Sequence, residues 1–224
     1  MSDPNSQPPP LNPLNDKLYK IEGVLKLIYL PGLVILPGMY LKIMLVVVFL
    51  LAIIRNYGMP VKSREYGLKV IGSEFAANIL YLAVISIASS QNSSLFFLPL
   101  TIHLSSGIIE FISRTNLNRY IQSGKLKEIA DTIKSRRNEL IVIKNKIEIG
   151  LLMFLLVLWF LGGSSIFQII VYLQFLSIKN KFNRNMQFAL TDLRSNISQS
   201  GLPAILKGVL VKVYDGMLKV INFI

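Results

Sequence analysis

Three long apolar stretches alternate with charged segments along this chain of 224 residues. The apolar stretches cover residues 27–54, 70–109 and 149–178, and the last of them contains no charged side chain. Nearly uncharged runs of about 18 residues or more are typical of helices that lie in lipid. The pattern therefore predicts an all-α integral membrane protein with about five or six membrane segments, some of them short.

Each apolar stretch is interrupted near its middle by a short uncharged break. The breaks are Pro31-Gly32 and Pro37-Gly38 in the first stretch, Ser89 to Ser94 in the second, and Gly162 to Ser165 in the third. Proline and glycine pairs and runs of serine end helices and form turns. We therefore predict three helical hairpins, over residues 21–54, 70–112 and 147–178.

The basic residues predict how these hairpins are oriented. The chain has 24 Lys and Arg against 12 Asp and Glu, a net charge of +12. If each stretch is a hairpin, every basic residue except Lys42 lies on one side of the membrane, and the positive-inside rule makes that side cytoplasmic. Both termini are then cytoplasmic, and Lys42 extends toward the far interface beside Tyr40.

The third stretch leaves two alternatives open. Each arm of a hairpin there has about 14 residues and a length of about 21 Å, short of a hydrocarbon core of about 30 Å. The other reading is one ordinary span over residues 149–172. The hairpin is favoured because it keeps its flanking lysines on the same side, namely Lys144, Lys146, Lys179 and Lys181. A hairpin this short occupies more of one leaflet than the other, which is a physical route to membrane curvature.

Two amphipathic helices are expected outside the hairpins. In the connector over residues 114–146, apolar residues recur at helical spacing between charged ones, namely Ile121, Leu126, Ile129, Ala130, Ile133 and Leu140. Such a helix lies on the membrane surface or on the cytosolic face of its own domain.

The second amphipathic helix is expected over residues 202–224, where Pro203 fits a first helical turn. A spanning helix would place several lysines in hydrocarbon, so an interfacial helix that binds anionic lipids of the cytoplasmic leaflet is favoured. The alternative is that its apolar face packs on the hairpins. The residues expected at the membrane surface are Leu206, Lys207, Lys212, Val213, Met217, Lys219 and Ile221.

These features divide the chain into three parts. Residues 1–16 form a proline-rich disordered tail without the features of a cleavable signal peptide. Residues 17–198 form the helical membrane domain, and residues 199–224 form the C-terminal amphipathic helix.

Composition argues against catalysis. The chain has no Cys and one His, which excludes disulfides and thiolate zinc sites and argues against imidazole-based chemistry. We find no phosphate-binding glycine loop or paired catalytic carboxylates, and we predict no enzymatic activity, cofactor or metal. The positive charge is explained by membrane orientation and anionic lipids, so no nucleic-acid binding is expected.

Glu74 and His103 are the ionisable residues that lie deepest in apolar sequence. Such residues are functional candidates in membrane proteins. They support an alternative function as a small transporter or channel that uses both side chains. A structural role is favoured because Glu74 lies near the cytosolic end of its helix and a neutral His103 can bond across helices.

The stretch from Phe167 to Arg194 resembles the transmembrane protein 33 family, which includes pore-membrane and perinuclear proteins of yeasts. In that family an aromatic helix ends in a basic cluster, followed by Arg-Asn and a short helix that closes on an acidic-Leu-Arg triplet. Residues 97–100 with His103, and residues 145–149, resemble two further family segments, and the resemblance covers about residues 20–197. The matching residues are Tyr172, Phe175, Leu176, Lys179, Lys181, Arg184, Asn185, Leu190, Asp192, Leu193 and Arg194.

The resemblance implies residence in the endoplasmic reticulum and nuclear envelope. It also implies roles in shaping tubular membrane, in contact with reticulon-type proteins, and in the distribution or assembly of nuclear pores. The basic loop of the family motif maps to Lys179, Lys181, Arg184, Asn185 and Arg194. The leading hypothesis is a non-enzymatic membrane-organising protein; a third reading is an adaptor whose basic connector docks soluble partners.

Overall fold

The computed structural model describes residues 13–88, 94–115, 117, 119, 124–201 and 203–223. Across this part the chain is built from helices and turns, with no strand, so the all-α prediction is confirmed. Most of the predicted tail, the serine-rich break at residues 89–93 and Ile121 of the connector lie outside the described residues.

The first hairpin consists of α1 (Pro13–Ile35) and α2 (Gly38–Tyr57). Helix α1 starts within the range predicted to be a tail, and the hairpin turns at Leu36-Pro37. The predicted break at Pro31-Gly32 is wrong, because α1 continues through Pro31. A proline near the end of a helix removes one backbone hydrogen bond, a cost that the packing of α1 on α2 offsets. A Cβ on Gly32 would lie 3.1 Å from the side chain of Leu41, so the glycine allows this close approach.

The second hairpin is more open than predicted. Its first arm is a bent pair, α3 (Arg64–Ile71) and α4 (Glu74–Ala88), whose axes differ by 68°. Its second arm is the 3-10 turn η1 (Ser94–Phe97) followed by α5 (Leu98–Arg114). Helix α4 packs mainly on α2 and α8, whereas α5 packs mainly on α1 and α7.

The third stretch forms a hairpin of α7 (Arg137–Phe160) and α8 (Ile166–Phe182). The turn between them contains Gly162 with φ 77, a left-handed conformation that favours glycine. Ser165 then begins α8 with a capping box, its side chain accepting from the Gln168 amide while the Gln168 side chain accepts from Ser165. The structure thus shows two helices joined by a turn in the third stretch, whereas the single-span reading needs one helix over residues 149–172.

The arms of this hairpin borrow residues from the connector. Helix α7 has 24 residues and a length of about 36 Å, and α8 has 17 residues and a length of about 25 Å. The connector helix α6 (Gly124–Ser135) is correspondingly shorter than predicted. Leu140 belongs to α7, so the prediction of one amphipathic helix reaching Leu140 is wrong, because Arg136 is not helical and separates the two helices.

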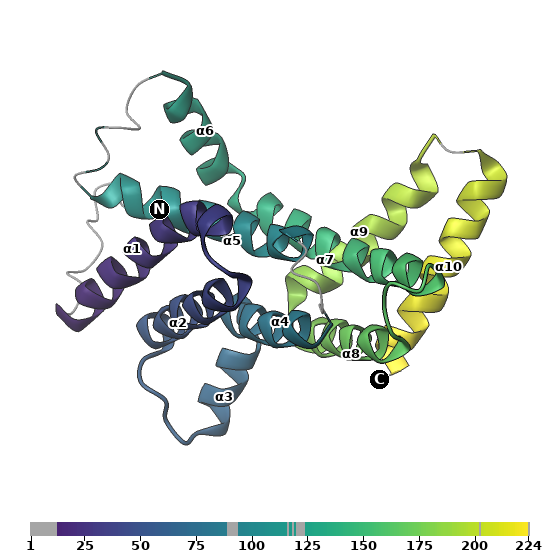
Figure 1. Cartoon of the computed structure of the whole chain (residues 1–224), viewed down its shortest axis with the longest axis horizontal. Coiled ribbons are helices and arrows are strands. Elements are labelled where there is room, and N and C mark those ends of the chain that lie inside the picture. The colour runs from purple at the N-terminus through teal and green to yellow at the C-terminus, as the bar shows by residue number, and fades with distance from the viewer. Residues whose placement is uncertain are drawn as a thin grey trace, which may run out of the picture.

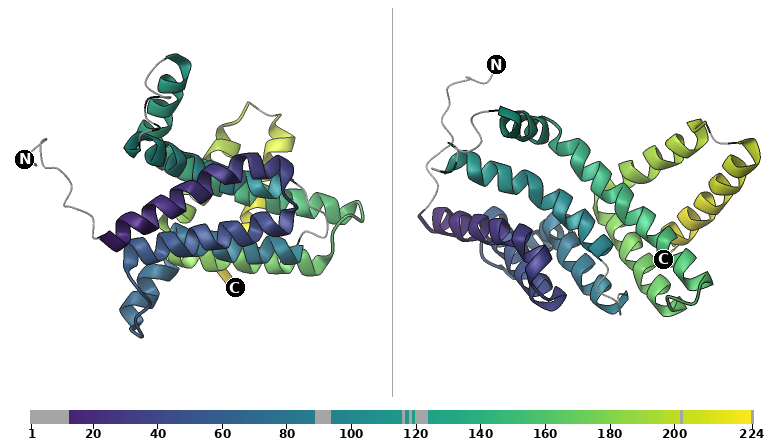
Figure 2. Two further views of the ribbon diagram at one scale, coloured as in Figure 1. Left: turned by 60° about the vertical axis from the view of Figure 1, so that its left-hand side comes forward. Right: turned by 45° about the horizontal axis from the view of Figure 1, so that its top comes forward.

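The chain ends in two further helices, α9 (Arg184–Gln199) and α10 (Ala204–Phe223), which form a V against α7 and α8. Figures 1 and 2 show that α3, α6 and the α9–α10 pair project from the packed hairpins in different directions. The core between the hairpins is apolar and aromatic, and includes Leu45, Tyr81, Leu100, Leu152 and Tyr172.

Two helices in the described residues are long and apolar enough to cross a membrane, Gly38–Tyr57 and Leu95–Arg114. The bent pair of α3 and α4 adds a third if it forms one broken span. Helices α7 and α8 do not meet this criterion, although their outer surfaces are apolar. The number of crossings therefore depends on how deeply the shorter hairpins insert.

Candidate functional site: a buried ion network and membrane-facing surfaces

Four ionised side chains join α4, α7 and α8 inside the protein. The Lys144 ammonium lies 2.7 Å from a Glu74 carboxylate oxygen and 3.4 Å from Glu148. The Lys179 ammonium lies 2.5 Å from the other Glu148 oxygen and 3.9 Å from Glu74. Lys144 and Glu148 are fully buried, and Lys179 is 3% exposed. Two cations and two anions alternate, so the group carries no net charge.

Two amide side chains extend this ion network. The Asn145 carbonyl oxygen accepts from Lys179 at 2.7 Å. Asn183 donates to Glu74 at 2.8 Å, and its own side-chain oxygen accepts from the Met186 amide as the N-cap of α9. One asparagine thus fixes the first turn of α9 and the start of α4 at once.

The ion network is costly to bury and strongly dependent on its geometry. Removing an unpaired ion from water costs several kcal/mol even after relaxation, and only close partners of opposite charge offset that cost. Lys144 and Glu148 are spaced i,i+4 on α7 and so share a face. The Tyr172 hydroxyl also donates to the Glu148 carbonyl at 2.9 Å, which holds α8 against the same turn of α7.

Sequence reasoning did not identify most of this ion network. In the sequence, Lys144 is one of the lysines that flank the third hairpin, and no role was predicted for Glu148, Asn145 or Asn183. The available signals were the i,i+4 Lys-Glu spacing inside an apolar helix and an Asn directly before a helical segment.

Glu74 and His103 have different direct partners in the structure. Both Glu74 carboxylate oxygens are engaged, by Lys144 and by Asn183. The His103 ring packs against Phe49 and Phe75, with centroid separations of 5.8 Å to each. The cavity beside His103 has a volume of only about 50 Å³. These contacts support a structural role for both residues, not a transport pathway.

A second group of ion pairs closes the first hairpin. Glu22 of α1 is 1% exposed and pairs with Lys26 on the same helix and with Arg55 at the end of α2, the latter at 3.3 Å. Glu110 of α5 pairs with Arg114 at 2.9 Å and with Arg137 of α7 at 3.7 Å. These ion pairs join α1 to α2 through Glu22 and Arg55, and α5 to α7 through Glu110 and Arg137.

The family-motif basic residues point in different directions. Lys179 faces inward to the ion network, whereas Lys181, Arg184 and Asn185 are exposed where α8 meets α9. Arg194 donates to both carboxylate oxygens of Asp215 in α10, at 2.7 and 3.0 Å. This hydrogen-bonded pair lowers the pKa of the Asp215 carboxyl.

Helix α10 divides its apolar face between two environments. Tyr214, Met217 and Ile221 are buried against α8 and α9, and the Tyr214 hydroxyl donates to the Leu190 carbonyl at 2.7 Å. The neighbouring arc is exposed, and its members are Ile205, Leu206, Val209, Val213, Val220 and Phe223. Lys212 and Lys219 are exposed beyond that arc, and Lys207 is partly buried. The expected membrane-surface residues are thus split: Met217 and Ile221 pack on the protein, Lys207 is partly buried on the far side of that packed face, and Leu206, Lys212, Val213 and Lys219 line or flank the exposed arc.

The tip of the third hairpin is apolar and open. Phe160 is 79% exposed, Leu161 77% and Phe167 61%, with Trp159 and Ile166 beside them. An exposed apolar patch of this kind marks a surface that contacts lipid or another protein. Its position at the uncharged end of the hairpin favours lipid.

The described residues hold no group of three or more His, Cys, Asp or Glu placed to bind a metal ion. A family model described as Transmembrane protein 33/Nucleoporin POM33 matches residues 24–221. No curated protein and no solved structure matches the chain.

Proposed function

Because the chain belongs to the transmembrane protein 33/nucleoporin POM33 family, we propose that it is a non-enzymatic organiser of the endoplasmic reticulum and nuclear envelope. In this proposal it shapes curved membrane and supports the organisation of nuclear pores, with both termini in the cytoplasm. The observation that carries the proposal is the exposed apolar arc of α10, flanked by Lys212 and Lys219. An arc of this composition inserts between lipid headgroups on one leaflet.

Two other projecting helices also support contact with the cytoplasmic leaflet. Helices α3 and α6 also expose apolar side chains beside charged ones, including Leu68 and Ile71 on α3 and Leu126 and Ile129 on α6. The helices that project from the hairpins would enlarge the protein's cross-section at the charged end of the hairpins. Unequal volume in the two leaflets bends a bilayer toward the less occupied side.

Changing Val209 to aspartate in the full chain, reconstituted in anionic vesicles, tests the α10 contact. The wild-type protein should reduce the mean vesicle diameter seen by electron microscopy. Val209→Asp should remove most of that reduction. It replaces a valine that lipid would bury with a carboxylate, and so weakens helix insertion by about tenfold.

Gly208→Asp is the matched control for Val209→Asp. It adds the same charge to the adjacent residue, on the polar side of α10, and a Cβ there meets nothing within 4 Å. It should leave the vesicle diameter as in the wild type. Equal effects of the two variants, or vesicles unchanged by the wild-type protein, would overturn the proposal.

The basic surface where α8 meets α9 is the proposed contact for protein partners, namely reticulon-type proteins and nuclear pore components. Its Lys181 and Arg184 side chains suit acidic partner segments. Lys181→Glu with Arg184→Glu should lower partner recovery after cross-linking in cells by about fivefold or more, since repulsion replaces attraction. Lys125→Glu with Lys127→Glu on α6 is the control. A similar loss of partner recovery in that variant would count against the α8–α9 junction as the contact.

A further inference from the structure

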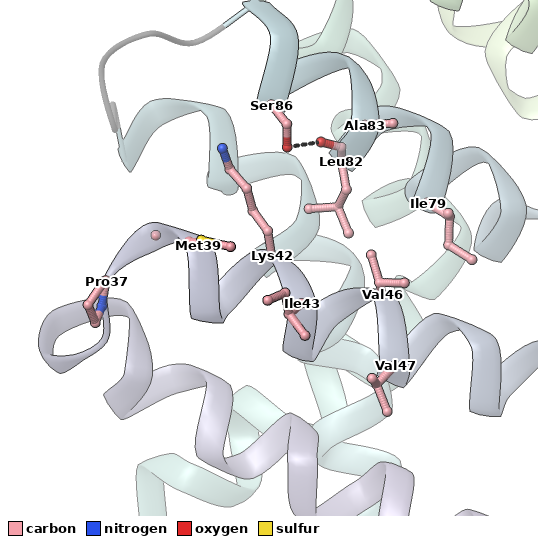
Figure 3. Close-up of a pocket in the computed structure, with 11 residues that line it drawn as sticks. Pro37, Met39, Lys42, Ile43, Val46, Val47, Ile79, Leu82, Ala83 and Ser86 are labelled. Atoms are coloured by element: carbon pink, nitrogen blue, oxygen red, sulfur yellow. Dashed lines mark hydrogen bonds between the residues drawn. The ribbon is translucent and has the colours of Figure 1, made fainter.

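An apolar groove lies between α2 and α4, at the end of the hairpins opposite the ion network. Its volume is about 650 Å³, within the range of about 300–1,000 Å³ that is usual for small-molecule sites. The aliphatic residues that line it are Ile43, Val46, Val47, Ile79, Leu82 and Ala83. Figure 3 shows them on the two helices, with Leu82 of α4 and Val46 of α2 pointing toward each other. Helix α2 is long and apolar enough to cross a membrane, and an α2 that spans the bilayer places this groove against hydrocarbon.

Lys42 lies at the mouth of this groove. Its side chain extends from α2 in the direction of Ser86 on α4 (Figure 3). The Ser86 hydroxyl donates to the Leu82 carbonyl at 2.7 Å. The structure gives the Lys42 ammonium no ion pair with a carboxylate in the described residues, and the side chain is half-buried. A half-buried cation beside apolar surface favours an anion as its partner.

We propose that the α2–α4 groove binds one anionic phospholipid, with an acyl chain along the aliphatic lining and the headgroup phosphate on Lys42. The proposal is independent of the membrane-shaping function. Three observations select a lipid: the aliphatic lining, the length and apolar composition of α2, and a single cation placed at one end of the groove. The first backbone N–H groups of α2 add positive potential at that end. Pro37 provides no side-chain cap for them.

A bound phospholipid would have a structural consequence. The buried ion network fastens α4 to α7 and α8 at the charged end of the hairpins, whereas the groove separates α2 from α4 at the opposite end. An acyl chain there would complete the packing of the first hairpin against the second.

Native mass spectrometry of the full chain in detergent micelles tests the proposal. The probes are phosphatidylserine, phosphatidylcholine of the same acyl chains, and free oleate. The wild-type protein should retain one phosphatidylserine in preference to phosphatidylcholine. Lys42→Gln should reduce that preference by about fivefold, the effect expected of one lysine at an anionic headgroup. Oleate should bind more weakly than phosphatidylserine.

Two further variants complete the test. Lys62→Gln removes the same charge from an exposed position between α2 and α3, beyond the other end of α2, and should leave retention unchanged. Ala83→Phe fills the groove from an exposed position and should lower retention of both phospholipids. Ala83→Leu is the milder replacement if the phenylalanine variant does not fold. The proposal is overturned if the wild-type protein retains both phospholipids equally, if oleate binds as tightly, if Lys62→Gln matches Lys42→Gln, or if the groove-filling variants change nothing. A dimer of the wild-type chain that Ala83→Phe separates would show that the groove binds a second copy of the protein instead of a lipid, and would also overturn the proposal.

Discussion

Replacing Glu148 with leucine should lower the free energy of unfolding by about 3–5 kcal/mol. The change leaves Lys179 without its closest carboxylate and leaves Lys144 with Glu74 alone, while both ammonium groups stay buried. The Lys144–Glu74 contact joins α7 to α4 across 70 positions of sequence. Without Glu148, the Lys144 ammonium loses one of its two carboxylate partners, and the attachment of α4 to α7 weakens. Denaturant unfolding in mild detergent micelles measures the effect.

Two companion variants show whether charge balance is the cause. Glu148→Leu combined with Lys179→Leu leaves the neutral pair of Lys144 and Glu74, so about half or more of the lost stability should return. Glu139→Leu removes an exposed carboxylate from the same helix and should change stability by no more than about 0.5 kcal/mol. A Glu148 variant as stable as the Glu139 variant would show that the ion network does not hold the hairpins together.

Placing aspartate at the tip of the third hairpin should prevent its insertion. Phe160→Asp with Phe167→Asp puts two carboxylates where the tip meets hydrocarbon, at a cost of up to about 3 kcal/mol for each residue. The chain has no native Cys, so a single cysteine in place of Gly163 reports the position of the tip. A Cβ at Gly163 makes only ordinary contact, 3.5 Å from Leu158. A membrane-impermeant maleimide on the cytoplasmic side should label this cysteine in the double variant and not otherwise.

Phe188→Asp provides the control for the hairpin tip. Phe188 is an exposed aromatic residue on α9, outside the hairpin, with 58% of its surface accessible. Its substitution should leave labelling at position 163 as in the unmodified hairpin. Labelling of the otherwise unmodified chain from the cytoplasmic side would show that the α7–α8 tip does not enter the membrane.

The predictions that hold best rest on local features. Uncharged breaks between charged flanks located the turns at Pro37 and at Gly162, because turn chemistry is set by the few residues that form it. Pro31 shows the limit of that rule: whether a proline ends a helix depends on the packing around it. The connector is shorter than predicted because α7 already begins at Arg137, and α7 as a whole packs against α5 and α9.

The sequence by itself determined that this protein is an all-helical membrane protein and located several of its turns, because hydrophobic period and turn chemistry act over a few residues. Only the tertiary structure decided which charges are structural. Lys144 and Lys179 look like other flanking lysines, and their burial follows from helices that meet across the fold. The same holds for α10, where helical packing decides that Met217 faces the protein and Val209 faces outward. Burial and ion pairing depend on which helices become neighbours, and that information is spread over the whole chain.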